Sequence, residues 1–185
     1  MDLSTFKNEH FDRGASQWKE FAWLVASELF VASPLPGSAW RAYLLRMFGA
    51  MIAPGVVLKP RIRIKFPWRL TVGENSWIGE GVWIDNLATV SIGKNVCISQ
   101  GAYLCTGNHD WSSDSFDLIT SNITIEDHSW VGARVTLAPG THMLAGAVIA
   151  LSGIGSGKME GWTVYAPSRA VKIAPRQHRG GNNAA

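Results

Sequence analysis

The chain has 185 residues, a length that suits one domain with a modest extension. Hydrophobic residues make up 46% and charged residues 17%, a balance that excludes wholesale disorder. The formal net charge is only +3 and the basic residues are scattered, so no nucleic-acid partner is expected. Cys97 and Cys105 are too few for a disulfide framework and lack metal-ligand spacing. We expect them to be buried thiols of a cytoplasmic protein.

The first 50 residues form a predicted N-terminal helical cap. Residues 1–20 contain seven charged side chains, so no signal peptide is expected. Helices are predicted at Ser16–Ala32 and Ser38–Ala50, on either side of the breaker at 33–37. The apolar stretch Phe21–Ala32 is too short for a membrane span. We expect the helices to cover the open end of the next domain. Contact with a membrane or a lipid-linked substrate is the alternative.

A six-residue period organises the chain from Ile52 onward. An aliphatic residue recurs every six positions, with two-residue skips after Leu70 and Val90 and a longer break after Leu104. These positions are Ile52, Leu58, Ile64, Leu70, Val72, Ile78, Ile84, Val90, Ile92, Ile98, Leu104, Ile125, Val131, Leu137, Met143 and Ile149. Small or acidic residues often follow them, and small or β-branched ones recur four positions on. Neither a helical period nor simple alternation fits this pattern, whereas short strands joined by tight corners do.

This pattern resembles the hexapeptide-repeat acyltransferases, over about two-thirds of the chain from Ile52 to Ile173. The resemblance implies an all-β fold, a left-handed parallel β-helix in which three hexads make one triangular coil. The expected domain spans residues 51–175, and a flexible tail is expected over 176–185.

The repeat breaks where chemistry is expected. After Leu104 the phase resumes at Ile125, which predicts an inserted loop of fifteen residues at 110–124. Excursions of this length are usually functional or disordered. His109 lies at the root of the loop, next to Asn108, which occupies a hexad position that elsewhere holds a small or β-branched residue. A departure from the hexad pattern beside a long loop predicts a functional site.

The segments Ile64–Leu70 and Ile98–Asp110 narrow the resemblance to the colanic-acid and exopolysaccharide O-acetyltransferase branch. This implies metal-independent transfer from acetyl-CoA to a sugar hydroxyl in polysaccharide biosynthesis, with His109 as general base. An imidazole, with a pKa near ~6.5, can take the proton of a hydroxyl that attacks the thioester. A carboxylate or carbonyl should orient this imidazole. Its identity is left open among Asp85, Asn86 and Asp110.

The resemblance also implies how the substrates bind. The expected acceptor is a sugar or a lipid-linked oligosaccharide, and the residues expected beside it are Asp85, Asn86, Asn108 and Asp110. The coenzyme is expected in a groove between subunits of a homotrimer. Trp130, Ala133 and Leu151 would line the pantetheine, and Lys158 and Arg176 would meet the phosphates.

Tyr165–Ala170 departs from the family pattern because it lacks the Gly-Asn-Pro turn that usually closes the domain. This departure supports a first alternative, a catalytically idle scaffold. A second alternative is a metal-dependent enzyme resembling the hexapeptide-repeat carbonic anhydrases. Their two closely spaced histidines have no counterpart among the histidines of this chain, which are His10, His109, His128, His142 and His178.

Overall fold

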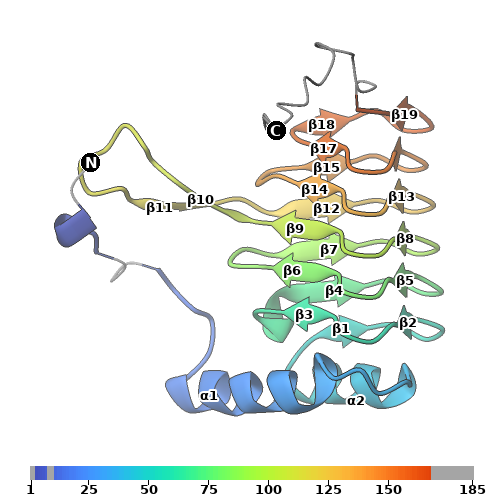
Figure 1. The fold of residues 1–185 in the computed structure, drawn as a ribbon, viewed down its shortest axis with the longest axis horizontal. Coiled ribbons are helices and arrows are strands. Elements are labelled where there is room, and N and C mark those ends of the chain that lie inside the picture. The colour runs from blue at the N-terminus through green and yellow to red at the C-terminus, as the bar shows by residue number, and fades with distance from the viewer. Residues whose placement is uncertain (1–2, 8–10, 168–185) are drawn as a thin grey trace, which may run out of the picture.

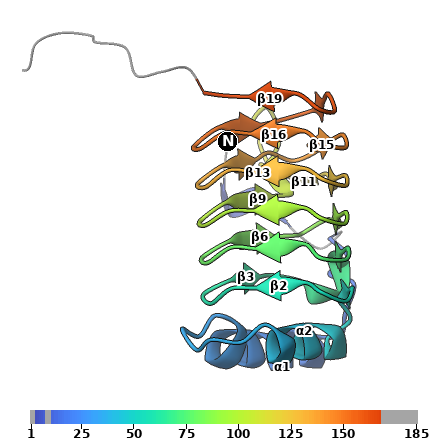
Figure 2. The same ribbon diagram turned by 90° about the vertical axis from the view of Figure 1, so that its right-hand side faces the viewer.

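The computed structural model describes residues 3–7 and 11–167. Short parallel strands stack into a triangular β-solenoid of about six turns (Figures 1 and 2), which confirms the predicted fold class. Its three sides are here called sheets A, B and C. Sheet A comprises β1 (Met51–Ile52), β4 (Leu70–Val72), β7 (Val90–Ile92), β12 (Ile123–Ile125), β15 (His142–Met143) and β18 (Lys158–Met159). Sheet B comprises β2 (Val57–Leu58), β5 (Trp77–Ile78), β8 (Cys97–Ile98), β13 (Trp130–Val131), β16 (Val148–Ile149) and β19 (Val164–Tyr165). Sheet C comprises β3 (Arg63–Ile64), β6 (Trp83–Asp85), β9 (Tyr103–Cys105), β14 (Thr136–Leu137) and β17 (Ile154–Gly155).

The core runs along the axis of the prism. All sixteen aliphatic positions of the predicted repeat are buried, none of them more than 6% exposed. In sheet A, Ile52, Val72, Ile92, Ile125 and Met143 lie in register on successive coils. Each inward side chain therefore packs on its equivalents above and below, which removes apolar surface from water in every coil.

The two cysteines lie outside this core. Both are free, and both are half-buried rather than buried as expected. Cys97 and Cys105 are strand neighbours of the inward-facing Ile98 and Leu104, and successive strand side chains point to opposite faces. Each thiol therefore lies on the outer side of its strand.

Two helical segments lie across the end of the prism beside the first coil (Figures 1 and 2). They are α1 (Gln17–Ala26), continued by the π-helical turn η2 (Ser27–Val31), and α2 (Ala39–Met47). The remaining helices of the described segments are the 3-10 turns η1 (Leu3–Thr5) and η3 (Pro67–Arg69). Both predicted helices are confirmed, and Ser16 caps α1 by accepting a hydrogen bond from the Lys19 amide. Across residues 3–7 and 11–167, no helix is long and apolar enough to cross a membrane.

A buried arginine connects these helices. Arg41 of α2 is fully buried and donates to the carbonyls of Val31, Ser33, Leu35 and Gly37, at distances between 2.6 and 3.1 Å. Loss of hydration lowers the pKa of its guanidinium. The segment between the helices, which the sequence marks only as a breaker, is thus organised around one side chain.

A hairpin interrupts the solenoid at the corner between sheets C and A. Its strands, β10 (Gly107–His109) and β11 (Leu118–Thr120), pair antiparallel and project away from the prism (Figure 1). Leu104 aligns with Ile84, and Ile123 aligns with Val90 of the preceding coil. The solenoid therefore resumes at Ile123 and not at Ile125, so the insertion is shorter than predicted. The error arose because Ile125 matches Ile92, which follows the two-residue skip after Val90.

Candidate active site

His109 lies on the outgoing strand of the hairpin, opposite Leu118. Its Nδ1 atom is 2.8 Å from the main-chain oxygen of Phe116. The imidazole stacks on the Phe116 ring with 4.2 Å between centroids and 3° between planes. The Phe6 ring approaches it edge-on at 5.7 Å. Two aromatic rings and one main-chain oxygen therefore fix the orientation of the histidine.

The Phe116 contact determines which ring nitrogen can act as a base. A carbonyl oxygen only accepts hydrogen bonds, so the neutral imidazole carries its proton on Nδ1. Nε2 then keeps its lone pair. Phe116 itself has a φ of 52°, a left-handed conformation that is unusual for a bulky residue and is often found at functional sites. The orienting group is thus a main-chain carbonyl and none of the candidates Asp85, Asn86 and Asp110.

His109 lines a cavity of about 290 Å³ at the base of the hairpin. The lining is mostly apolar, with two cationic side chains, and consists of Phe6, Phe11, Arg13, Lys65, Phe66, Leu87, His109 and Leu118. Such a site places an apolar surface beside a few polar groups that can position a substrate.

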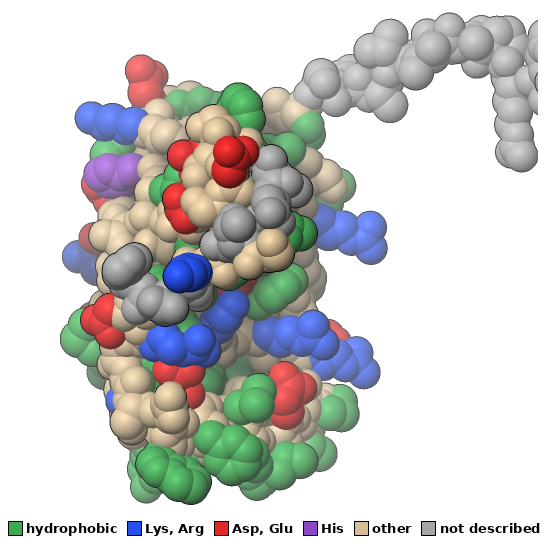
Figure 3. Space-filling model, turned by 90° about the vertical axis from the view of Figure 1, so that its left-hand side faces the viewer, with side chains coloured by type: hydrophobic (Ala, Val, Ile, Leu, Met, Phe, Trp, Pro, Cys, Tyr) green, Lys and Arg blue, Asp and Glu red, His purple; other side chains and the backbone are tan. Residues whose placement is uncertain are grey.

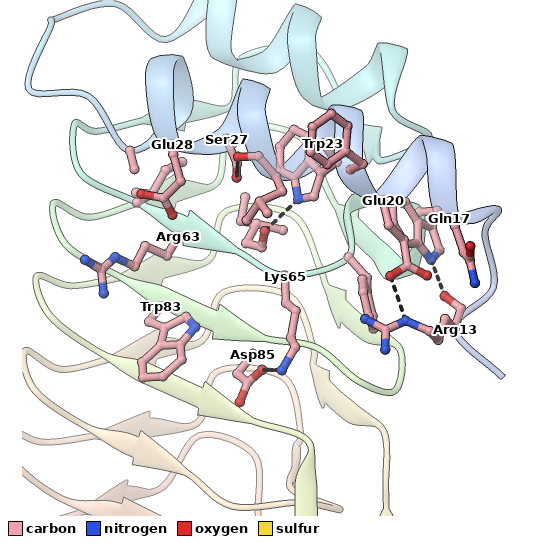
Figure 4. Close-up of a pocket in the computed structure, with 17 residues that line it drawn as sticks. Arg13, Gln17, Glu20, Trp23, Ser27, Glu28, Arg63, Lys65, Trp83 and Asp85 are labelled. Carbon is pink, nitrogen blue, oxygen red and sulfur yellow. Dashed lines mark hydrogen bonds and ion pairs between the residues drawn. The ribbon is translucent and has the colours of Figure 1, made fainter. Parts of the chain in front are cut away.

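Figure 4 shows a larger groove, of about 700 Å³, which shares lining residues with this cavity. It lies between α1 and sheet C, and Arg13, Lys65 and Phe66 line both spaces. Trp83 lies in the groove below Trp23 and Glu28, and Lys65 points toward Asp85 (Figure 4). The two spaces are therefore neighbours, one beside His109 and the other beside α1.

The part of the groove on sheet C offers an aromatic surface beside charged groups. Trp83 is 42% exposed, and its ring packs at 4.7 Å against Tyr103, its partner on the next coil. Lys65 Nζ lies 3.2 Å from Asp85 Oδ1, and the Tyr103 hydroxyl donates to Asp85 Oδ2 at 3.2 Å. Burial, and then the nearby Cys105 and Asp85, raise the pKa of Tyr103 above its usual range. Tyr103 therefore stays a protonated donor.

The four expected acceptor residues occupy different environments. Asp85 faces the groove. Asn86 is fully buried, and its side-chain amide bonds both the amide and the carbonyl of Phe66. It therefore has a structural role in place of the expected substrate contact, since no atom of its amide is left accessible.

The other two acceptor residues lie on the hairpin. Asn108 is exposed and accepts from the His109 amide at 2.8 Å. Asp110 accepts from the amide and the hydroxyl of Ser112, and these hydrogen bonds hold the pKa of its carboxyl below its usual value. Both side chains shape the hairpin around His109.

Within one copy of the protein, the residues expected to bind the coenzyme lie away from His109 in space. Trp130 is an exposed residue of sheet B whose indole donates to Ser99. Ala133 and Leu151 lie at the corner between sheets B and C, on successive coils. His109 leaves the prism at the opposite edge of sheet C. Lys158 lies on sheet A, apart from the Trp130 group, and Arg176 falls outside the described residues.

The residues missed by the sequence reasoning are Arg13, Lys65, Trp83 and the carbonyl of Phe116. Lys65 lies one coil before Asp85, just as Trp83 lies one coil before Tyr103. The coil length that the repeat defines could therefore have predicted both contacts. No local signal marks the Phe116 carbonyl, because its position depends on the conformation of the hairpin turn.

The comparisons with known proteins agree with this architecture. No family model matches the chain. Over 150 residues it is 39% identical to the protein named as colanic acid biosynthesis acetyltransferase WcaF in Escherichia coli (strain K12), and the match covers 80% of this chain and 82% of the relative. The same values hold for WcaF of Shigella flexneri. The chain therefore belongs to the WcaF family of hexapeptide-repeat acetyltransferases.

Solved structures show the same fold. A hexapeptide-repeat acetyltransferase of Vibrio cholerae O1 biovar eltor, in complex with acetyl-coenzyme A, has a TM-score of 0.74 and is 24% identical; the match covers 89% of this chain and 91% of that one. A maltose O-acetyltransferase of Clostridium difficile 630 has a TM-score of 0.70 and is 20% identical, with coverages of 81% and 82%. In the part of the chain that the structure describes, no three His, Cys, Asp or Glu side chains form a group that could hold a metal ion.

Proposed function

We propose that this protein transfers the acetyl group of acetyl-CoA to a sugar hydroxyl in the biosynthesis of an exopolysaccharide of the colanic-acid type. The observation that supports this most directly is His109. Its Nδ1 is held by the Phe116 carbonyl, so its Nε2 lone pair is free beside a partly apolar cavity. The named activity of the WcaF relatives and the acetyl-CoA bound by the Vibrio structure agree with this chemistry.

The reaction needs one base and no acyl-enzyme intermediate, because the acetyl group passes directly from the thioester to the hydroxyl. His109 Nε2 takes the proton of the acceptor hydroxyl as its oxygen attacks the thioester carbonyl. The new C–O bond forms, and collapse of the tetrahedral intermediate breaks the C–S bond. The histidine then returns the proton to the thiolate of coenzyme A. The Phe116 carbonyl accepts the Nδ1 proton in a hydrogen bond, so Nε2 is the nitrogen that takes and then returns the proton.

The groove between α1 and sheet C is the proposed acceptor site. A pyranose ring has an apolar C–H face and a polar rim of hydroxyl groups. Trp83 offers a partly exposed aromatic face for the first, and Asp85 and Lys65 offer an acceptor and a donor for the second. The groove adjoins the cavity of His109, so a bound sugar could place a hydroxyl next to the imidazole.

We further propose that the complete site forms between copies in a homotrimer. On one chain, His109 and the corner that contains Ala133 and Leu151 lie at opposite edges of sheet C. The hairpin projects away from its own prism (Figure 1), which is the direction needed to reach a neighbouring one. Packing three prisms around an axis would bring the hairpin of one copy to the coenzyme corner of the next.

The proposal is tested by measuring release of free thiol from acetyl-CoA with and without sugars of the kind found in bacterial exopolysaccharides. The expected result is release that depends on the sugar, with an O-acetylated sugar identified by mass spectrometry. Release at the same low rate with every sugar and without any would favour the idle scaffold. If the product instead carries the acetyl group on an amine, the acceptor is an amino sugar and the proposed hydroxyl acceptor is wrong.

A further inference from the structure

The helical end of the molecule exposes an unusual amount of apolar surface. Large hydrophobic side chains from α1, η2, α2, their connections and the adjoining strand β1 are between 42% and 82% exposed, namely Trp18, Phe21, Leu24, Val25, Leu29, Phe30, Leu35, Tyr43, Met47 and Met51. Figure 3 shows hydrophobic side chains gathered at the lower end of the molecule, where these helices lie. An apolar surface of this extent usually marks a protein or membrane contact.

Only part of this surface belongs to the acceptor groove. Phe21 and Leu24 line the groove, whereas Trp18, Val25 and Leu29 do not. Positions 18, 25 and 29 repeat at helical spacing on another stripe of the same helical segment. We call this stripe, with Leu35, Tyr43 and Met47, the end surface. Its exposure is not explained by substrate binding to the groove.

Charge is divided along the axis of the solenoid. The described residues up to 70 form the helices and the first coil. They include ten Lys and Arg and three Asp and Glu, which gives a net charge of +7. Residues 71 to 167 include three Lys and Arg and nine Asp and Glu, which gives a net charge of −6. Arg41 is buried and Glu28 is exposed near the end surface. The basic excess therefore lies mainly on the first coil, directly beside the helices, and comes from Lys59, Arg61, Arg63, Lys65 and Arg69, whereas the described coils beyond it are acidic.

We infer that the end surface docks on an anionic phospholipid bilayer. Apolar side chains exposed beside an excess of basic residues match a bilayer with negative headgroups, which attract Lys and Arg while the interface accepts Trp and Leu. The acidic remainder of the prism would be repelled from the same surface. This division of charge along the axis therefore favours one orientation, with the helices on the lipid and the coils pointing away.

This orientation has a consequence for the acceptor, and that consequence rests on the proposed function. The same helix, α1, lines the acceptor groove on one side and contributes to the end surface on another. Docking would place the mouth of the groove at the bilayer, within reach of a sugar attached to a lipid. Docking itself can be tested without any acetyl transfer.

The test is co-sedimentation of the full chain with lipid vesicles. We expect binding to vesicles that contain phosphatidylglycerol, weaker binding to pure phosphatidylcholine, and a loss of binding as salt rises. The double variant Trp18→Glu/Leu29→Glu should lower the partition coefficient roughly tenfold or more. The matched control is Ile154→Glu, a 78% exposed apolar residue at the other end of the prism, which should bind like the unchanged protein.

Equal binding of the double variant and the control would overturn the inference, as would a lack of any binding to anionic vesicles. Because Trp18 and Leu29 are exposed and outside the groove, the double variant should keep its melting temperature and its activity on a soluble sugar. If the unchanged protein instead forms larger assemblies that the double variant dissociates, a second copy covers the end surface and the bilayer is excluded. Docking without any acetyl transfer would leave this inference standing while removing the proposed function.

Discussion

The orientation of the His109 imidazole depends on a main-chain atom. The carbonyl of Phe116 holds Nδ1 of His109, and the Phe116 ring packs flat against the imidazole. A carbonyl, unlike a carboxylate, contributes no full negative charge to the ring. The geometry therefore fixes the tautomer without a buried ion pair, which would carry a desolvation cost.

A substitution of Trp83 tests whether the groove binds the sugar acceptor. Trp83→Ala should raise KM for the sugar roughly tenfold, because the aromatic face is lost, while kcat stays within about a factor of two. Steady-state thiol release measures both constants. Trp77→Ala, which removes a comparably exposed tryptophan from sheet B, is the control and should leave KM for the sugar unchanged. A fall in kcat with an unchanged KM would place Trp83 outside the acceptor site.

Single residues also show where sequence reasoning ends. The place of His109 at the root of the hairpin could be predicted because it stands beside a break in a regular repeat. Asp85 could be predicted, but its partner Lys65 was missed although it lies one coil earlier. Asn86 was expected to face substrate and instead holds Phe66, because burial of a polar side chain follows from packing rather than from residue type.

Among the elements, the helical cap depends on the connection between η2 and α2. Arg41 satisfies four carbonyls there from a fully buried position. Arg41→Lys should destabilise the protein by about 3 kcal/mol, since an ammonium cannot reproduce the planar fork of donors. Thermal unfolding measures this loss. Arg63→Lys, at an exposed position, should change the melting temperature little. Equal effects of the two substitutions would contradict the structural role of Arg41.

The hairpin has its own dependence on pH. Hydrogen bonds from Ser112 lower the pKa of Asp110, so the folded turn favours the carboxylate over the protonated form. This stabilisation is complete above the pKa of the unfolded chain and is lost as pH falls through the lower folded value. Asp110→Asn should therefore speed hydrogen exchange in residues 107–120 at neutral pH, and the unchanged hairpin should open only in acid below the ordinary range of Asp. Opening at higher pH would contradict the role of Asp110.

The elements were predicted to different degrees, for physical reasons. The coils and the core could be predicted from the six-residue period, because every coil buries aliphatic side chains at equivalent positions. Both helices followed from the breaker that separates them, and a capping serine marks the start of the first. The hairpin was expected as a loop of fifteen residues, because a repeat gives no information about segments that leave it. Pairing of β12 with β7 shows that the insertion is shorter, since the solenoid resumes at Ile123.

For the whole molecule, the separation of His109 from the corner that we propose to bind the coenzyme predicts complementation between chains. His109→Ala and Leu151→Glu should each be nearly inactive alone. Mixed trimers of the two should recover roughly a quarter of full activity, because one site in four would combine an intact hairpin with an intact coenzyme corner. The measurement is thiol release after co-refolding equal amounts of both variants. No recovery would indicate that each chain builds its own site.

The proposed mechanism requires the imidazole of His109 to remove the proton from the acceptor hydroxyl. The most direct test compares sugar-dependent thiol release by His109→Ala with that by His128→Asn, a change at a solenoid corner. We expect His109→Ala to lose on the order of 10²–10⁴-fold in kcat with KM for acetyl-CoA nearly unchanged, and His128→Asn to keep full activity. Equal rates for His109→Ala and the unchanged protein would contradict the account.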